Sequence, residues 1–265
     1  MCELLALNSN TPAPIAFEFT GFSARGGRTG EHVDGFGLAF HQDAGCRVFR
    51  DAGRASDAAL AHWLRRTPIH ATTTLAHIRK ATQGRVALEN THPFQRELWG
   101  RTWVFAHNGD LKGYAPRLHA GFRPVGDTDS ERAFCWLMQE LAKAHASVPP
   151  VDELTLTLAE LLPQIARHGT CNVLLSNGQA LWAHASTRPG SPGLHWLQRS
   201  HPFRAATLAD ADLTVDFAPL TTPDDRVVVV ATEPLTADEP WLALAAGEMK
   251  VFRGGAPYGP GALQR

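Results

Sequence analysis

Short runs of apolar and β-branched residues recur along the 265-residue chain with little helical periodicity. Runs of this length, bounded by Gly, Pro, Asn and Asp, are typical of β-strands. We therefore expect strands at Glu3–Leu7, Gly35–His41, Arg47–Arg50, Thr72–Ile78, Thr102–His107, Cys171–Ser176, Ala180–His184, Arg226–Ala231 and Met249–Phe252.

Three longer segments have the apolar spacing of amphipathic helices. They are Ser56–Arg66, Thr128–His145 and Val151–Arg167. The second begins with Thr128 and Glu131, which have the spacing of a capping box. Strands outnumber helices, and the helices do not alternate regularly with strands, so antiparallel sheets covered by helices fit better than a doubly wound parallel sheet. The expected fold class is α+β.

Composition and charge narrow the classes of partner. With 44% hydrophobic and 19% charged residues the chain can bury one substantial core, and no linker divides it, so we expect a single domain over residues 1–265. Its 25 basic and 26 acidic residues give a net charge of −1, which provides no field for nucleic acid or an anionic membrane. The chain has no apolar run long enough to span a bilayer and no targeting segment, so we expect a cytoplasmic protein.

Cysteine and histidine spacing argues against a metal centre. Cys2, Cys46, Cys135 and Cys171 are widely separated, so neither a disulfide framework nor a zinc site is indicated. The 13 histidines include no metal-binding motif. We therefore expect no metal and no cofactor.

The second residue of the chain carries reactive chemistry. Met1 precedes a small side chain, so its removal would leave Cys2 with a free α-amine beside its thiol. Such an amine has a pKa of about 7.7 to 8.0 and can accept a proton near neutral pH. A thiol with a pKa of about 8.5 is a strong nucleophile once ionised. The alternative is that Cys2 is a small hydrophobic residue at the start of a strand.

An arginine follows a predicted strand in the run Leu75–Thr82. Arg79 stands where a strand end can present a guanidinium to a pocket, and its planar fork can hold a carboxylate with two parallel hydrogen bonds. The alternative is an ordinary surface arginine at the end of a strand.

A second motif is the apolar strand Trp103–His107, which runs into Asn108 and Gly109. An Asn-Gly dipeptide turns the chain easily, so one interpretation is a hairpin turn. The other is an oxyanion hole, in which the Asn108 amide and the Gly109 backbone N–H direct two donors at one oxygen.

A third motif, Gly126–Glu131, opens the longest predicted helix. Helix capping accounts for Thr128 and Glu131. It does not require Asp129, whose carboxylate has spare acceptors for an ammonium group.

Five motifs together resemble the glutaminase domains of class II glutamine amidotransferases. They are, in chain order, Met-Cys at the start, Ala76–Thr82, Asn90–Phe94, Ala106–Gly109 and Gly126–Glu131. The chain is also similar to the stand-alone YafJ-like members of that group, from Met1 to about Phe252. That similarity is carried by Gly26-Gly27, Asp34–Gly37, Leu88–Phe94 and Phe134–Leu137.

The resemblance implies the fold of an N-terminal-nucleophile hydrolase, a four-layer αββα sandwich with two antiparallel sheets between helical layers. It also implies roles for seven residues. Cys2 would be the nucleophile, and Asn108 with Gly109 would stabilise the oxyanion. Arg79 would hold the substrate α-carboxylate and Asp129 its α-ammonium. The glutamine pocket would also be lined by Thr82 and Gln83, although Gln83 and Lys80 replace the histidine and tryptophan common in members with a synthase domain.

The implied reaction is attack of Cys2 on the γ-amide of glutamine or of a γ-glutamyl compound, which releases ammonia or an amine through a thioester. The ammonia would pass to a separate synthase subunit, or the protein would be a free-standing γ-glutamyl amide hydrolase, as in ergothioneine assembly. We favour the hydrolase. Two alternatives stay open: an N-terminal-cysteine acylase acting on other conjugated amides, and a catalytically silent glutamine or γ-glutamyl sensor in which Met1 is retained.

Overall fold

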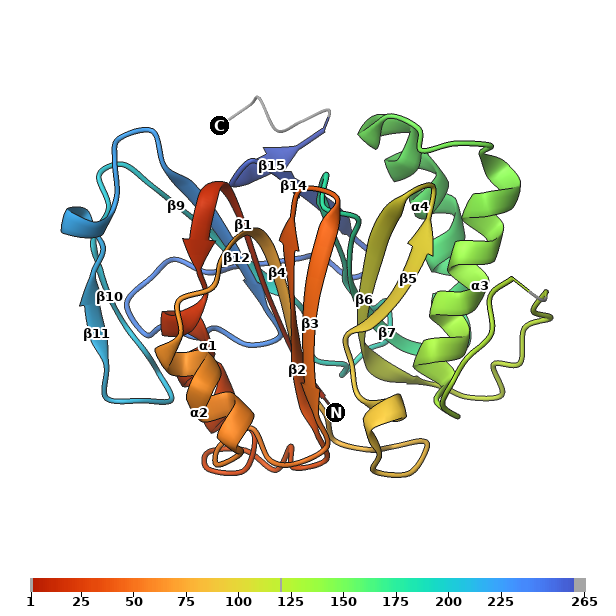
Figure 1. The fold of residues 1–265 in the computed structure, drawn as a ribbon, viewed down its shortest axis with the longest axis horizontal. Helices are drawn as coiled ribbons and strands as arrows, with labels where there is room; N and C mark the ends of the chain where they lie inside the picture. Colours follow the sequence, from red (N-terminus) through yellow and green to blue (C-terminus); the bar gives the residue numbers. More distant parts are fainter. Residues whose placement is uncertain (1, 120, 260–265) are drawn as a thin grey trace.

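Two antiparallel sheets stacked face to face form the centre of the molecule, and helices cover their outer faces (Figure 1). The computed structural model describes residues 2–119 and 121–259. The four-layer αββα arrangement implied by the resemblance is therefore confirmed. The single domain expected over residues 1–265 stays a prediction.

The first sheet has seven strands. Its order is β13 (Leu242–Ala243), β9 (His195–Ser200), β12 (Arg226–Ala231), β1 (Glu3–Pro14), β4 (His70–Ile78), β2 (Phe36–Gln42) and β3 (Gly45–Asp51). Since β1 lies between β12 and β4, the start of the chain is held at the middle of this sheet.

The second sheet has six strands. Its order is β15 (Ala256–Tyr258), β14 (Met249–Arg253), β8 (Leu181–His184), β7 (Gly169–Ser176), β6 (Arg101–Leu111) and β5 (Phe94–Leu98). A separate ribbon pairs β10 (Ala205–Thr207) with β11 (Thr214–Asp216). Two 3-10 turns complete the described elements, η1 (Leu88–Asn90) and η2 (Ala218–Leu220).

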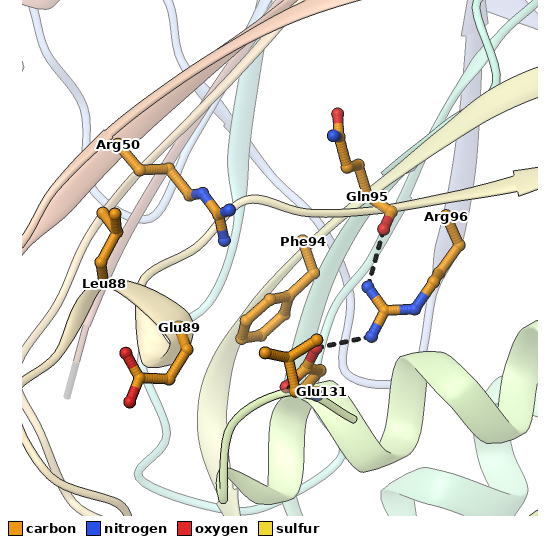
Figure 2. Close-up of a pocket in the computed structure, with 8 residues that line it drawn as sticks. Arg50, Leu88, Glu89, Phe94, Gln95, Arg96 and Glu131 are labelled. Atoms are coloured by element: carbon orange, nitrogen blue, oxygen red, sulfur yellow. Dashed lines mark hydrogen bonds and ion pairs between the residues drawn. The ribbon is translucent and has the colours of Figure 1, made fainter. Parts of the chain in front are cut away.

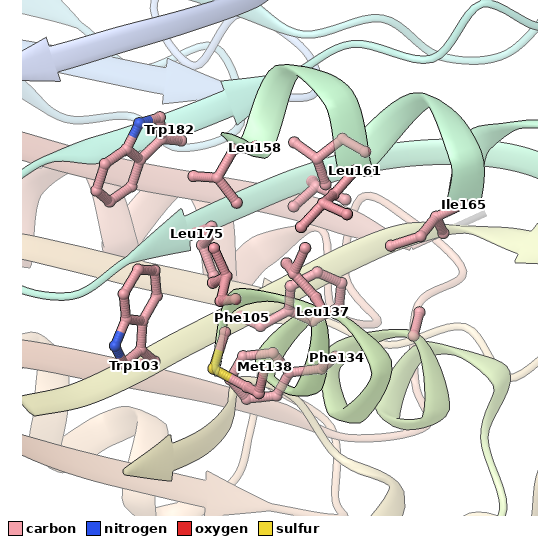
Figure 3. Close-up of a cluster of buried hydrophobic side chains, with 14 of the residues drawn as sticks. Trp103, Phe105, Phe134, Leu137, Met138, Leu158, Leu161, Ile165, Leu175 and Trp182 are labelled. Carbon is pink, nitrogen blue, oxygen red and sulfur yellow. The ribbon is translucent and has the colours of Figure 1, made fainter. Parts of the chain in front are cut away.

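The helices form the two outer layers. On the first sheet lie α1 (Ala16–Ala24) and α2 (Ala59–Arg66), and on the second lie α3 (Asp129–Ala144) and α4 (Val151–Ala166) (Figure 1). Figure 3 shows the core under α3 and α4, where the Phe134 ring stacks on Phe105 at a centroid distance of 5.1 Å. None of the helices in residues 2–119 and 121–259 combines the length and apolarity that crossing a bilayer requires.

Besides the two cores under the helix layers, an apolar core fills the space between the two sheets, so the central strands are apolar on both faces. In β1, Leu4 and Ala6 point toward the second sheet, while Leu5 and Leu7 pack under the helices. Strands buried on both faces read as continuous apolar runs. This explains why the strand at the start of the chain can be predicted without a helical alternative.

The predicted strands and helices are present, with differences at their ends. The main correction concerns the strand predicted at Thr102–His107. It continues as β6 to Leu111, because β7 pairs with it as far as Leu111. The hairpin turn considered at Asn108 and Gly109 is therefore wrong. The Thr128 hydroxyl accepts the Glu131 N–H at 3.2 Å, as the capping box predicts.

Candidate active site

Strand alternation directs three of the predicted site residues toward the space between the two sheets. Successive side chains of a strand point to opposite sides. Cys2 comes two residues before Leu4, which points between the sheets. On β4 the same alternation runs through Leu75 and His77 to Arg79, two residues after His77. Because Glu3 pairs with Ile78, Cys2 and Arg79 lie beside each other at one end of the first sheet.

The second sheet presents Asn108 to the same space. Val104 and Ala106 of β6 belong to the core between the sheets, and Asn108 continues their alternation. A hydrogen bond of 3.2 Å from His77 Nε2 to the His107 carbonyl joins β4 to β6 at this point. The two sheets are thus bridged immediately beside Asn108.

The Cys2 thiol is held against the backbone that follows Arg79. The Lys80 N–H donates to Cys2 Sγ at 3.3 Å, and the Cys2 thiol donates to the Lys80 carbonyl at an Sγ–O distance of 3.3 Å. Cys2 is 9% exposed. Burial raises the pKa of the thiol to about 11, although the Lys80 N–H and the charge of Arg79 lower it. The resting group is therefore a thiol, and its ionisation near neutral pH requires a base.

Arg79 holds the loop that follows it. Its Nη1 donates to the Arg85 carbonyl at 2.9 Å, and its Nη2 donates to the carbonyls of Gln83 at 2.9 Å and Gly84 at 3.2 Å. Among the described residues these backbone oxygens are its hydrogen-bond partners, and the side chain is buried. The charge of this buried guanidinium is thus matched by dipoles and not by a carboxylate, which leaves it suited to an anionic ligand.

The loop of residues 80–91, here called the 80–91 loop, contains the two predicted pocket residues. The Thr82 side chain is exposed and makes no hydrogen bond to Cys2. Gln83 is half-buried, and its carboxamide donates to Asp110 at 2.5 Å, one residue beyond Gly109. Gln83 therefore ties the loop to β6.

Asp129 supplies the negative charge of the site. It is buried at the start of α3, where its Oδ2 accepts the Leu111 N–H at 2.7 Å and its Oδ1 accepts the Ser130 N–H at 2.8 Å. Its charge acts on the Cys2 thiol and raises that pKa, opposite in sign to Arg79. The thiol therefore lies in the field of one fixed cation and one fixed anion, a pattern that suits an amino-acid zwitterion.

Asn108 is a fully buried residue whose side chain has no hydrogen-bond partner. Both its Nδ2 and its Oδ1 are without one among the described residues. Asn172, directly opposite on β7 and also fully buried, differs because its amide binds Pro192 and Ser186. An unpaired buried amide costs about 1–3 kcal/mol of stability, which makes Asn108 a candidate for hydrogen bonding to a ligand.

Gly109 is required by the close approach of β7. A Cβ at this position would lie 1.8 Å from the Thr170 carbonyl oxygen and 2.5 Å from His107 Nε2. The physical reason for glycine here is this crowding inside a strand and not the positive φ of a turn.

Sequence reasoning missed the buried histidines behind the site. His107 Nε2 lies 3.2 Å from the Thr170 carbonyl and Nδ1 lies 2.8 Å from the Ser130 hydroxyl, so the ring links β6 to the residue after Asp129. Burial lowers the pKa of His77 to about 3, so its imidazole is neutral at physiological pH. The available signal was the period of two, which puts His77 on the same face as Arg79.

The four central candidate residues are all buried. Cys2, Arg79, Asn108 and Asp129 are each at most 9% exposed. Met1 lies outside the described residues, so its removal stays a prediction.

Comparison with known proteins relates this arrangement to one family. Residues 1–264 match the family model described as "Glutamine amidotransferases class-II". The chain is 46% identical over 253 residues to the YafJ protein of Escherichia coli (strain K12), covering 95% of this chain and 97% of that protein.

Solved structures agree with this relationship. A 2.0 Å crystal structure from Pseudomonas aeruginosa PA01, named a "predicted glutamine amidotransferase", is 39% identical with a TM-score of 0.77, over 98% of this chain and 100% of that one. Glutamine phosphoribosylpyrophosphate amidotransferase from B. subtilis shares the fold at 15% identity and a TM-score of 0.58, with 100% of this chain matching 50% of that one. This chain belongs to the class II glutamine amidotransferases.

Proposed function

We propose that the protein is an amidohydrolase in which Cys2, freed of Met1, attacks the γ-amide of glutamine or of a γ-glutamyl compound. The observation that carries this proposal is the unpaired amide of Asn108, which faces the space between the sheets on the same side as Cys2. Arg79 and Asp129 add opposite charges near the thiol. A nucleophile, a spare donor and a zwitterion clamp together favour acyl transfer from an amino acid.

The first half-reaction begins with transfer of the Cys2 thiol proton to its own α-amine. Because the thiol pKa is about 11, the amine is needed as a base. The sulfur then bonds to the γ-carbon, and Asn108 Nδ2–H donates to the resulting oxyanion. The C–N bond breaks, the nitrogen takes the proton from the α-ammonium, and ammonia or an amine leaves a thioester behind.

The second half-reaction is hydrolysis of that thioester. The α-amine, neutral again, takes a proton from water while the hydroxyl bonds to the acyl carbon. The C–S bond then breaks, the sulfur regains its proton from the ammonium, and glutamate or the γ-glutamyl acid is released. Arg79 and Asp129 hold the α-carboxylate and α-ammonium throughout.

The identity of the amine that is released from the γ-amide distinguishes two versions of this function. The chain matches half of the B. subtilis enzyme, so the acceptor reaction of that enzyme is not carried over. We favour a free-standing γ-glutamyl amide hydrolase over a glutaminase that supplies a separate synthase subunit. Release of an amine larger than ammonia would support the hydrolase.

The test combines intact mass with turnover. Protein that begins at Cys2 should hydrolyse glutamine or a γ-glutamyl amide, Cys2→Ala should not, and Cys46→Ala, a matched control on β3, should keep wild-type turnover. Near-normal turnover in Cys2→Ala would end the proposal. Uniform retention of Met1 with glutamine binding and no turnover would favour the sensor. Faster cleavage of an N-acyl amide, insensitive to Arg79→Gln, would favour the acylase.

A further inference from the structure

A cavity of about 290 Å³ lies away from Cys2, between the edge strands of the two sheets. Its walls come from Arg50 on β3, η1, Phe94 on β5 and the start of α3 (Figure 2). None of the seven residues assigned to the glutamine site lines it. It is therefore a separate feature with chemistry of its own.

The two guanidiniums of the cavity differ in their partners. Arg96 is committed, because it pairs with Glu131 at 2.5 Å and donates to the carbonyls of Gln95 and Arg123. Arg50 points into the cavity (Figure 2). Within the described part of the chain its side chain makes one hydrogen bond, from Nη1 to the Thr91 carbonyl at 3.2 Å. It forms no ion pair with any carboxylate of the described residues. A half-buried guanidinium with free N–H groups can bind one carboxylate through its fork.

The rest of the lining includes two exposed apolar side chains and two carboxylates. Leu88 is 49% exposed and Val125 is 79% exposed, and both line the cavity together with Phe94. A ligand with an apolar body would cover them, at about 25 cal/mol for each Å² removed from water. Glu89 and Glu131 also line this space, but Arg85 and Arg96 pair with them. Arg50 is then left to balance a single negative charge, which favours a monocarboxylate over a polyphosphate.

The cavity is connected to the glutamine site through the 80–91 loop. Arg79 holds the early part of this loop, and Leu88 and Glu89 of its late part line the cavity. The Asn90 amide bridges the loop to Asp127, two residues before Asp129, through bonds to the Asp127 carboxylate at 2.6 Å and the Asp127 N–H at 3.0 Å. An occupant that restrains η1 would therefore restrain the segments that carry both clamp residues.

We propose that this cavity binds a small monocarboxylate with an apolar body, held by Arg50 and covering Leu88 and Val125, and that its occupation strengthens glutamine binding. The binding part stands independently of the catalytic assignment. The coupling part rests on the proposed function.

Binding is tested by isothermal titration calorimetry of the full chain with hexanoate and 3-phenylpropanoate. Wild-type protein should bind each with one saturable site. Arg50→Gln and the exposed-rim variant Val125→Asp should each bind at least about tenfold more weakly, a loss of about 1.4 kcal/mol. Arg47→Gln, an exposed arginine on the same strand, should bind as wild type. Hexanamide and inorganic phosphate should not bind.

Two further outcomes separate this site from the glutamine clamp. In Cys2→Ala protein, excess glutamine should not displace hexanoate. In wild-type protein, saturating hexanoate should lower KM for glutamine at least twofold, and Arg50→Gln should abolish that effect. The proposal is overturned by absence of hexanoate binding, by binding equal in Arg50→Gln, or by displacement with glutamine. If hexanoate binds as expected but no glutamine or γ-glutamyl amide is turned over, the proposed function fails and the site stands. If turnover is normal but KM does not respond, the coupling fails.

Discussion

Replacing Asn108 by leucine should separate stability from activity. Leucine has nearly the shape of asparagine and carries no polar atoms. Because both polar atoms of the Asn108 side chain are buried without partners, their removal should raise the free energy of unfolding by about 1–3 kcal/mol. Loss of an oxyanion donor should lower kcat by about 10²–10³. The variant is therefore expected to be more stable and nearly inactive.

Asn172 is the matched control on the facing strand. It is equally buried and lies opposite Asn108, but its amide donates to the Pro192 carbonyl at 2.9 Å and accepts the Ser186 N–H at 2.9 Å. Asn172→Leu should lower the free energy of unfolding by about 1–3 kcal/mol for each group left unpaired. Urea unfolding and ammonia release measure the two quantities. An Asn108→Leu protein that is destabilised by more than about 1 kcal/mol and keeps wild-type kcat would refute the reasoning, because the amide would then be structural.

Three other predictions follow from the same geometry. Gly109→Ala should destabilise the protein by about 3 kcal/mol or more, since its Cβ would lie 1.8 Å from the Thr170 oxygen, whereas Gly45→Ala, with its nearest atom at 3.6 Å, should be nearly neutral in thermal unfolding. In a profile of kcat/KM against pH, turnover should rise through the pKa of the Cys2 α-amine, about 7.7 to 8.0. A rise centred near the Cys2 thiol pKa of about 11 would argue against the amine as the base. Burial lowers the pKa of His184 to about 4 in the folded protein, so the unfolded chain takes up this proton at a higher pH than the folded chain does. The free energy of unfolding should therefore fall as pH drops from about 6.5, by up to ~1.4 kcal/mol per pH unit. His184→Leu should flatten this slope, measured from urea midpoints, and an unchanged slope would exclude this histidine as a source.

The sheets could be predicted because their strands are continuous apolar runs, but their extent depends on tertiary partners. The end of β6 was missed since Asn108 and Gly109 are turn formers, and only pairing with β7 keeps them extended. The helix α1 was missed for a different reason. It is buried on several sides, including Phe19, Gly21 and Phe22, so it shows no single apolar stripe. The edge strand β5 has a polar centre and gave no strand signal.

The sequence names candidate site residues but does not indicate the contacts that they make. The order of motifs named Cys2, Arg79, Asn108 and Asp129, and strand alternation directs the first three toward the space between the two sheets. No local pattern indicates that Arg79 binds the carbonyls of its own loop, because that contact depends on how the loop folds back. The burial that raises the thiol pKa likewise comes from the second sheet, which is distant in sequence.

The most direct measurement is site-resolved mass spectrometry after reaction with a diazoketone analogue of glutamine, which alkylates the attacking nucleophile. The account predicts one adduct per chain, on a Cys2 that is the first residue, and none in Cys2→Ala. Glutamine should protect against it. An adduct on Cys46, Cys135 or Cys171, or turnover by chains that all retain Met1, would contradict the account.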